Sequence, residues 1–234
     1  MSLTFNKSHA KSQETFTPAV PGVYDLRIDD VRLLERGEKR ANGLENKIAE
    51  DVVFITLRVV KEHERDMNEE KEQLGNTIEV FFTDPETAPN DNVREKANIS
   101  IIQFLTSITD GTENLYEGMT KAQAIKALEE SRSSKMEQLE KEITDWNSVG
   151  TAFENRKGQY VRSLMKALYN KRDEKYYVNF PRYDANKFEP VEFPYKVTTL
   201  EFSPAKHSMP VQPDTEKTDT TDSPLDAKPD DLPF

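Results

Sequence analysis

The sequence predicts a mainly β domain with added helices, followed by a long acidic tail. Residues 22–84 contain three segments with the apolar patterns of strands. Residues 92–146 change to the spacing of helices, and residues 159–183 return to strand-like patterns. Between residue 204 and the last residue, Phe234, there is no other aromatic side chain, so this region lacks the material for a core.

Composition narrows the class of protein. The 234 residues are 35% hydrophobic and 32% charged, with a net charge of −11, so part of the chain is expected to bury no core. No run of apolar residues is long enough for a membrane span, and the first residues lack the apolar core of a signal peptide. We therefore expect a cytoplasmic protein. Cysteine is absent, which excludes disulfides, thiolate zinc sites and cysteine nucleophiles.

The first half of the domain reads as three strands. Segment 22–36 alternates, with Val23, Asp25, Arg27, Asp29 and Val31 on one face and Tyr24, Leu26, Ile28 and, past Asp30, Leu33 towards the other. Segment 51–62 is β-branched and aromatic, as in a central strand, and segment 76–84 is the third strand. Hydrophilic connections at 35–50 and 63–75 favour an antiparallel meander.

Two helical stretches follow. Residues 92–108 repeat apolar side chains at helical spacing, with Asp91 as a candidate N-cap. Residues 120–146 form a longer stretch capped by Thr120, whose apolar stripe is interrupted by Arg132 and has a candidate break at 131–135. We expect the stripe to pack against the sheet.

The chain then returns to strands. Residues 159–170 and 176–183 read as a hairpin around a basic turn, although 163–170 alone also suits a helix. A last extended piece, 191–202, is expected to lie along the body. Beyond it, residues 204–234 read as a disordered acidic tail.

Five strands with a helix between the third and the fourth is the element order of an OB-fold, a small Greek-key barrel. We therefore expect a five-stranded OB-fold barrel over residues 1–203, with a helical insertion at about 91–146, followed by the tail at 204–234. This fold commonly binds oligonucleotides through strands two and three and the loop between strands four and five.

Charge and aromatic residues gather in one segment. Residues 151–187 contain nine Lys or Arg against four acids, a local charge of +5, and seven of the 21 aromatic residues of the chain. Cations that follow phosphates and rings that stack on unpaired bases are the two ingredients of sequence-independent binding to single-stranded nucleic acid. The alternative is that these are ordinary strand aromatics and solubilising cations.

Candidate DNA-binding residues come from this segment and from strands two and three. Tyr160, Arg162 and Lys166 share one face if their segment is extended, and Tyr177 is expected to face DNA with the basic turn. One of the adjacent Phe81 and Phe82 is expected to face the groove. The full set is Arg58, Phe82, Arg156, Lys157, Tyr160, Arg162, Lys166, Lys171, Arg172, Lys175, Tyr177 and Arg182.

The chain ends in PDDLPF, which resembles the C-terminal tip of bacterial single-stranded DNA-binding proteins. That tip has acidic residues, an aliphatic residue, proline and a terminal phenylalanine; the matching residues here are Asp230, Asp231, Leu232 (usually Ile in the family), Pro233 and Phe234. The body is longer than in that family and has extra helices, so the chain looks more like a phage-encoded relative or analogue acting in a bacterial host.

The resemblance implies that these five residues bind replication, recombination and repair proteins. Phe234 can enter an apolar pocket, its carboxylate can meet a cation, and the two aspartates can steer towards a basic rim. The tail, with seven acids and three lysines, can also compete with DNA for the basic groove of its own chain. A sliding-clamp ligand is the weaker reading, because Asp230 and Asp231 replace the usual upstream Gln.

We expect no enzymatic activity, metal or cofactor. The sequence has no phosphate-binding Gly-Lys-Ser/Thr loop, nucleophile elbow or dinucleotide fingerprint, and its three histidines lack metal spacing. The expected function is protection of single-stranded DNA in replication, recombination and repair. The alternatives are a recombination mediator or protein–protein adaptor, and a strand-annealing protein. The acidic helical stretch is a candidate for self-association, and the choice between DNA and RNA stays open.

Overall fold

The structure is a computed structural model. It describes residues 20–35, 37–39, 51–65, 73–112, 115–170, 175–181, 187–195, 200 and 202–203.

Strands come before and after a helical region, as the sequence predicts. In chain order the elements are β1 (Gly22–Leu34), β2 (Val52–Arg65), β3 (Thr77–Thr83), the short 3-10 helix η1 (Pro85–Thr87), α1 (Asp91–Ser107), α2 (Lys121–Glu142), α3 (Trp146–Glu154), β4 (Tyr160–Asn170), β5 (Lys175–Asn179) and β6 (Phe188–Glu189).

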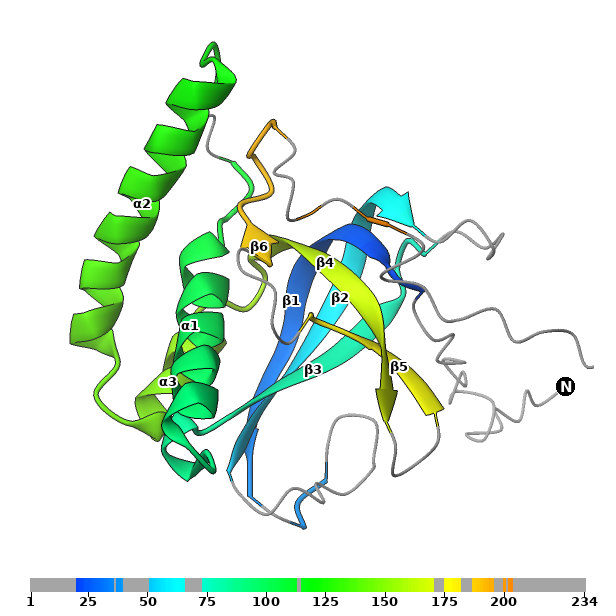
Figure 1. Cartoon of the computed structure of the whole chain (residues 1–234), viewed down its shortest axis with the longest axis vertical. Coiled ribbons are helices and arrows are strands. Elements are labelled where there is room, and N and C mark those ends of the chain that lie inside the picture. Colours follow the sequence, from blue (N-terminus) through cyan, green and yellow to red (C-terminus); the bar gives the residue numbers. More distant parts are fainter. Residues whose placement is uncertain are drawn as a thin grey trace, which may run out of the picture.

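The strands form one antiparallel sheet in the order β3-β2-β1-β4-β5. The first half of β4 pairs with β1, and its second half pairs with β5. The short β6 pairs with β4 at Arg162 and Ser163. The sheet is strongly twisted, and the three helices gather on one side of it with α2 outermost (Figure 1).

The core lies between the sheet and the helices. β1 contributes Tyr24, Leu26 and Ile28, all fully buried, and the neighbouring strands add aliphatic side chains on the same face. Within this core, five phenylalanines pack ring against ring: Phe82, Phe104, Phe153, Phe180 and Phe188. They come from β3, α1, α3 and the segment around β5 and β6, so this cluster joins the two halves of the chain.

A β-bulge in β1 changes which side chains face the core. The register with β2 shifts between Ile28 and Asp30, so Asp29 is an extra residue on β1. Val31 therefore packs in the same core as Tyr24, Leu26 and Ile28. The expected grouping of Val31 with Asp25 on the opposite face is wrong, because simple alternation does not continue through a bulge.

The helices differ in detail from the sequence prediction. Helix α1 is capped by Asn90, whose side chain accepts a hydrogen bond from the Val93 backbone; Asp91 is the first helical residue. Thr120 caps α2 through a capping box with Gln123, as predicted. Helix α3, capped by Asp145, was not predicted as a separate element.

Helix α2 continues without a break through the polar stretch at 131–135. Arg132 Nη2 donates to the Phe188 carbonyl at 2.6 Å, and Lys135 Nζ donates to the Ile108 carbonyl at 2.9 Å. These two polar side chains lie within the apolar stripe, and each binds a backbone carbonyl, one in β6 and one just after α1. Within the described residues, no helix combines the length and the apolar character needed to cross a membrane.

Candidate nucleic-acid interface

The outer face of the sheet, opposite the helices, carries side chains in cross-strand rows. Pairing between the strands places Arg32 beside Phe54 and Phe54 beside Phe81. Two residues further along, Asp30, Thr56 and Glu79 form the next row. The third row runs over four strands and consists of Tyr160, Arg27, Arg58 and Thr77. Successive rows are about 6.6 Å apart, since a strand rises about 3.3 Å per residue.

Phe81 is the exposed aromatic of this face. Its ring is tilted against that of Phe54, with centroids 5.7 Å apart, and the residue is 39% exposed. Phe54 beneath it is buried. A supported, exposed ring of this kind is a surface on which an unpaired base can stack.

Phe82 points to the other side of the sheet. It is 8% exposed and stacks on Phe153 in the core, with centroids 5.3 Å apart. This placement corrects the choice of Phe82 as the groove residue, because adjacent strand residues face opposite sides and the helices cover the side of Phe82. Phe81 takes its place in the candidate interface.

Two carboxylates on this face each hold two cations. Asp29 accepts from Arg27 Nε at 2.8 Å and from Arg58 Nε at 2.5 Å. Asp30 accepts from Arg32 Nε at 2.8 Å and from Lys157 Nζ at 3.0 Å. The bulge at Asp29 lets consecutive aspartates each reach a separate pair of cations.

Electrostatics differ from the strongly basic groove that the sequence suggested. Burial alone would raise the pKa of Asp30, but hydrogen bonds from Arg32 and Lys157 outweigh it and hold that pKa below its ordinary value. The positive charges of Arg32 and Lys157 are thus partly neutralised by Asp30. Two more acids add negative charge to this face: Glu79 lies in the row of Asp30, and Glu154 lies 3.2 Å from Lys157. A bound phosphate would have to draw these cations away from carboxylates.

Tyr160 and Arg58 lie on the outer face where the sequence placed them. Tyr160 is half-buried beside Arg27 and packs against Gly111, where an added Cβ would come within 3.2 Å of the ring. Gly111 also has φ +78°, a conformation that favours glycine. Arg58 also donates from Nη1 to the Gly75 carbonyl at 3.0 Å. This contact and the pair with Asp29 together fix the position of the Arg58 side chain.

Arg162 is engaged inside the molecule. Its side chain is 12% exposed, and Nε donates to Asp25 at 2.7 Å. Its other nitrogens donate to the carbonyls of Val191 and Phe193 at 2.6 and 2.7 Å. This geometry corrects its assignment to the DNA groove: Arg162 fastens the segment after β6 to the sheet.

Asp25 is the centre of that buried group. Burial would raise its pKa, but hydrogen bonds from His63 and Arg162 together lower it below the ordinary value. His63 Nε2 lies 2.9 Å from Asp25 Oδ1. An ionised Asp25 therefore holds the Arg162 side chain in place.

Arg156 also has a structural role. It forms a two-pronged pair with Glu142 at 3.0 and 3.1 Å and donates to the Ala152 carbonyl, which links α3 to the end of α2. Lys166 is half-buried on β4 opposite Asn179. Neither belongs to the rows around Phe81.

Several predicted site residues lie outside the described part of the molecule. They are Lys171, Arg172 and Arg182, the side chains of Lys175 and Tyr177, and the tip residues Asp230, Asp231, Leu232, Pro233 and Phe234.

Sequence reasoning missed Arg27, Arg32 and Phe54 as members of the candidate interface. Arg27 and Phe54 are visible in the strand patterns, but their position beside Arg58 and Phe81 depends on register. The one-residue shift at the bulge decides that Arg32 stands next to Phe54. No local sequence signal specifies that shift.

Comparison with known proteins returns no match: no family model, no curated protein and no solved structure matches this chain. In the described residues, no group of three or more His, Asp or Glu side chains is arranged to hold a metal ion.

Proposed function

We propose that this protein binds single-stranded DNA without sequence preference across the outer face of β1, β2 and β3. The observation that carries the proposal is the exposed ring of Phe81, supported by Phe54 and aligned with Arg32 across three strands. A ring offers stacking to any base, and arginines beside it offer contacts to the phosphates that follow.

The proposal includes a finer description of the fold, a five-stranded OB-fold barrel. Two features support it. The strand order β3-β2-β1-β4-β5, with helices between β3 and β4, is that of the Greek-key barrel cut open between β3 and β5. These two end strands also approach each other in space. In such a barrel the rows around Phe81 lie on strands two and three, where oligonucleotides commonly bind.

We further propose that the acidic tip recruits replication, recombination or repair proteins while the body protects the strand. This part rests on the resemblance of residues 229–234 to the tip of bacterial single-stranded DNA-binding proteins. A phage origin and action in the cytoplasm of a bacterial host belong to the same proposal. The competing function is a protein–protein adaptor or recombination mediator, in which the tip matters and DNA is secondary.

The test is a titration of fluorescent oligo-dT with the full-length chain at about 50 and 200 mM salt, with duplex DNA as competitor. We expect binding that weakens with salt and is insensitive to duplex. Absence of binding at the lower salt would overturn the DNA proposal and leave the adaptor. Acceleration of pairing between complementary strands in the same preparation would identify an annealing protein.

A further inference from the structure

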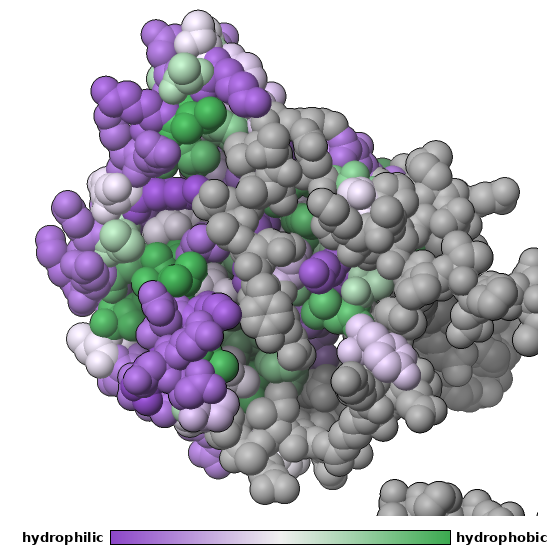
Figure 2. All heavy atoms as spheres, viewed as in Figure 1, coloured by the Kyte–Doolittle hydropathy of each residue, from purple (hydrophilic) through white to green (hydrophobic). Residues whose placement is uncertain are grey.

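A cavity of about 370 Å³ opens on the helix side of the sheet, away from the candidate DNA interface. Its walls come from η1, α1, the last turns of α2 and the start of α3. In the space-filling view, apolar residues reach the surface between α1 and the end of α2, bordered by hydrophilic ones (Figure 2). Nothing in the proposed DNA binding uses this cavity.

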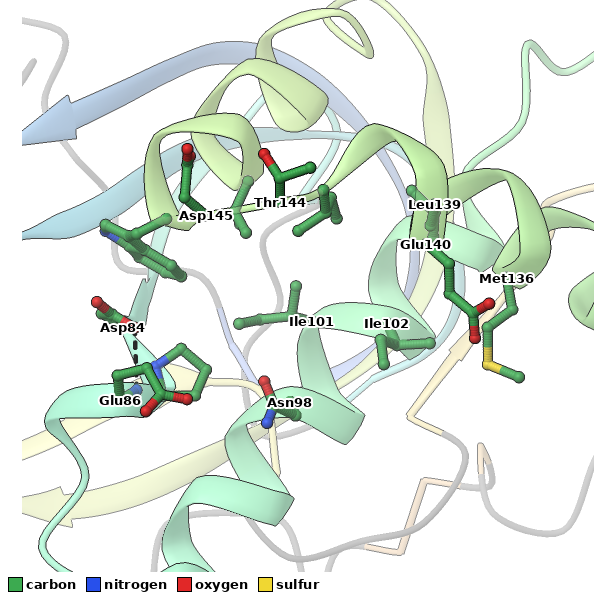
Figure 3. A pocket seen from close by; sticks show the side chains of 14 residues that line it. Asp84, Glu86, Asn98, Ile101, Ile102, Met136, Leu139, Glu140, Thr144 and Asp145 are labelled. Atoms are coloured by element: carbon green, nitrogen blue, oxygen red, sulfur yellow. Dashed lines mark hydrogen bonds between the residues drawn. The ribbon is translucent and has the colours of Figure 1, made fainter.

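The cavity has an apolar floor. Ile101, Leu139 and Val149 reach it from the core, and Ile102 and Ile143 add further aliphatic side chains. Met136 stands at the mouth with 41% of its surface exposed. Figure 3 shows Ile101 and Ile102 from α1 facing Leu139 and Met136 from α2 across the opening. A volume of this size accommodates one or two large apolar side chains.

The rim is acidic. Four carboxylates, those of Asp84, Glu86, Glu140 and Asp145, belong to the lining, and no Lys or Arg is among the described residues that form it. Asp84 and Asp145 also cap η1 and α3, so the local fold holds them at the rim (Figure 3). The described ion pair of Glu86 is loose, with Arg94 Nε 4.0 Å from its Oε2.

Trp146 adds an unused hydrogen-bond donor. It lines the cavity, and its indole Nε1 is buried with no hydrogen-bond partner among the described residues. The indole ring also adds apolar surface to the lining, so Trp146 lies where it would sense an occupant of the cavity.

We propose that this cavity docks a peptide segment of a partner protein that inserts an apolar side chain and places Lys or Arg beside it. The floor selects the apolar side chain, and the four carboxylates select cations around it. The same carboxylates argue against the acidic C-terminal tip of this chain as the occupant, because Asp230, Asp231 and the terminal carboxylate would be repelled.

Trp146 provides a local readout, because it is the only tryptophan of the chain. The probes are four short peptides added to the whole protein. Lys-Leu-Phe-Lys, Glu-Leu-Phe-Glu and Lys-Ser-Ser-Lys are capped at both ends, whereas Pro-Asp-Asp-Leu-Pro-Phe is capped only at its N-terminus and keeps a free carboxylate. Only the first should produce a saturable change in tryptophan emission. Equal responses to the first two peptides, a response to the fourth, or no response to the first would each overturn the proposal.

A matched pair of variants tests the acidic rim. Glu140→Lys reverses a rim charge, whereas Glu137→Lys makes the same change on α2 at an exposed residue outside the cavity lining. We expect the first variant to bind Lys-Leu-Phe-Lys on the order of threefold to tenfold more weakly and the second to resemble the wild type. Equal effects of the two variants would show only a general influence of net charge and would overturn the site. The outcome is independent of DNA binding, which uses the other face of the sheet.

Discussion

Arg162 and Asp25 lie on paired positions of β4 and β1, with Nε and Oδ1 2.7 Å apart and side chains only 12% and 8% exposed. The pair is surrounded by His63 and by two backbone carbonyls from the segment after β6. A cation that looked suited to phosphate in the sequence is thus a link between the sheet and the C-terminal part of the domain.

Replacing Arg162 with Ala should therefore destabilise the fold. Removing one partner leaves Asp25 buried without its main counter-charge, which typically costs about 3–5 kcal/mol. Urea unfolding of Arg162→Ala should show this loss. Lys126→Ala removes a cation from an exposed pair with Glu130 and should stay within about 0.5 kcal/mol of the wild type. Similar stabilities for both variants would contradict the structural role.

Phe81→Ala should weaken binding to oligo-dT without a large change in stability. Loss of one stacked base costs about 1–3 kcal/mol, or roughly fivefold to a hundredfold in affinity. Phe81→Trp should keep most of the affinity, because a larger ring still stacks. Ile99→Ala, an exposed apolar residue on α1, is the matched control and should bind as the wild type does. If both alanine variants bind alike, Phe81 is not part of the interface.

The neighbouring Phe82 should behave in the opposite way. Phe82→Ala empties a place in the aromatic cluster and should cost about 3–5 kcal/mol of stability. Affinity for oligo-dT, measured where the variant is still folded, should remain close to that of the wild type. A large loss of affinity with intact stability would show instead that Phe82 contacts DNA.

Asp30→Asn should increase affinity for oligo-dT at low salt. The change releases Arg32 from its carboxylate and leaves Lys157 with Glu154 as its remaining partner, so both are more available to phosphates, with an expected gain of about twofold to fivefold. Glu137→Gln makes the same change in net charge on α2 and serves as the control in the same binding assay. An Asp30 variant that binds no better than this control would place the phosphates elsewhere.

Stability should depend on pH through Glu189. Burial raises the pKa of Glu189 from 4.5 to about 7, although Arg162 and Arg132 oppose the shift. Between these values the folded protein keeps a proton that the unfolded chain releases, so stability falls as pH rises from about 4.5 to 7. The loss is at most about 3 kcal/mol.

Glu189→Gln should remove this dependence. The variant should be more stable than the wild type at pH 8 and nearly equal to it at pH 4.5, where Glu189 is protonated in the folded protein and about half protonated in the unfolded chain. Denaturant unfolding at these two pH values measures the difference in stability. The control Glu137→Gln should differ from the wild type by the same small amount at both. A pH profile of Glu189→Gln parallel to that of the wild type would mean that Glu189 is ionised in the folded protein.

Element types were largely predictable because they depend on local periodicity. The alternation in β1, the β-branched run in β2 and the capping Thr120 of α2 are all readable within a few residues. Helix α3 was missed because it is short and follows α2 closely: the predicted helical stretch ended at Trp146, where α3 begins. The ambiguity of 163–170 was resolved as strand by pairing with β5, a contact with residues beyond the local window.

By itself the sequence determined the order of strands and helices, the acidic tail and the gathering of cations and aromatic residues after residue 150. Only the tertiary structure decided which of those side chains reach the outer face. Arg162 is engaged with Asp25, Phe82 belongs to the core, and Phe81 with Phe54 and Arg32 forms the surface row. The physical reason is contact between distant segments: the helices cover the side of Phe82 and the segment after β6 encloses Arg162. One extra residue at Asp29 sets the register that places Arg32 beside Phe54.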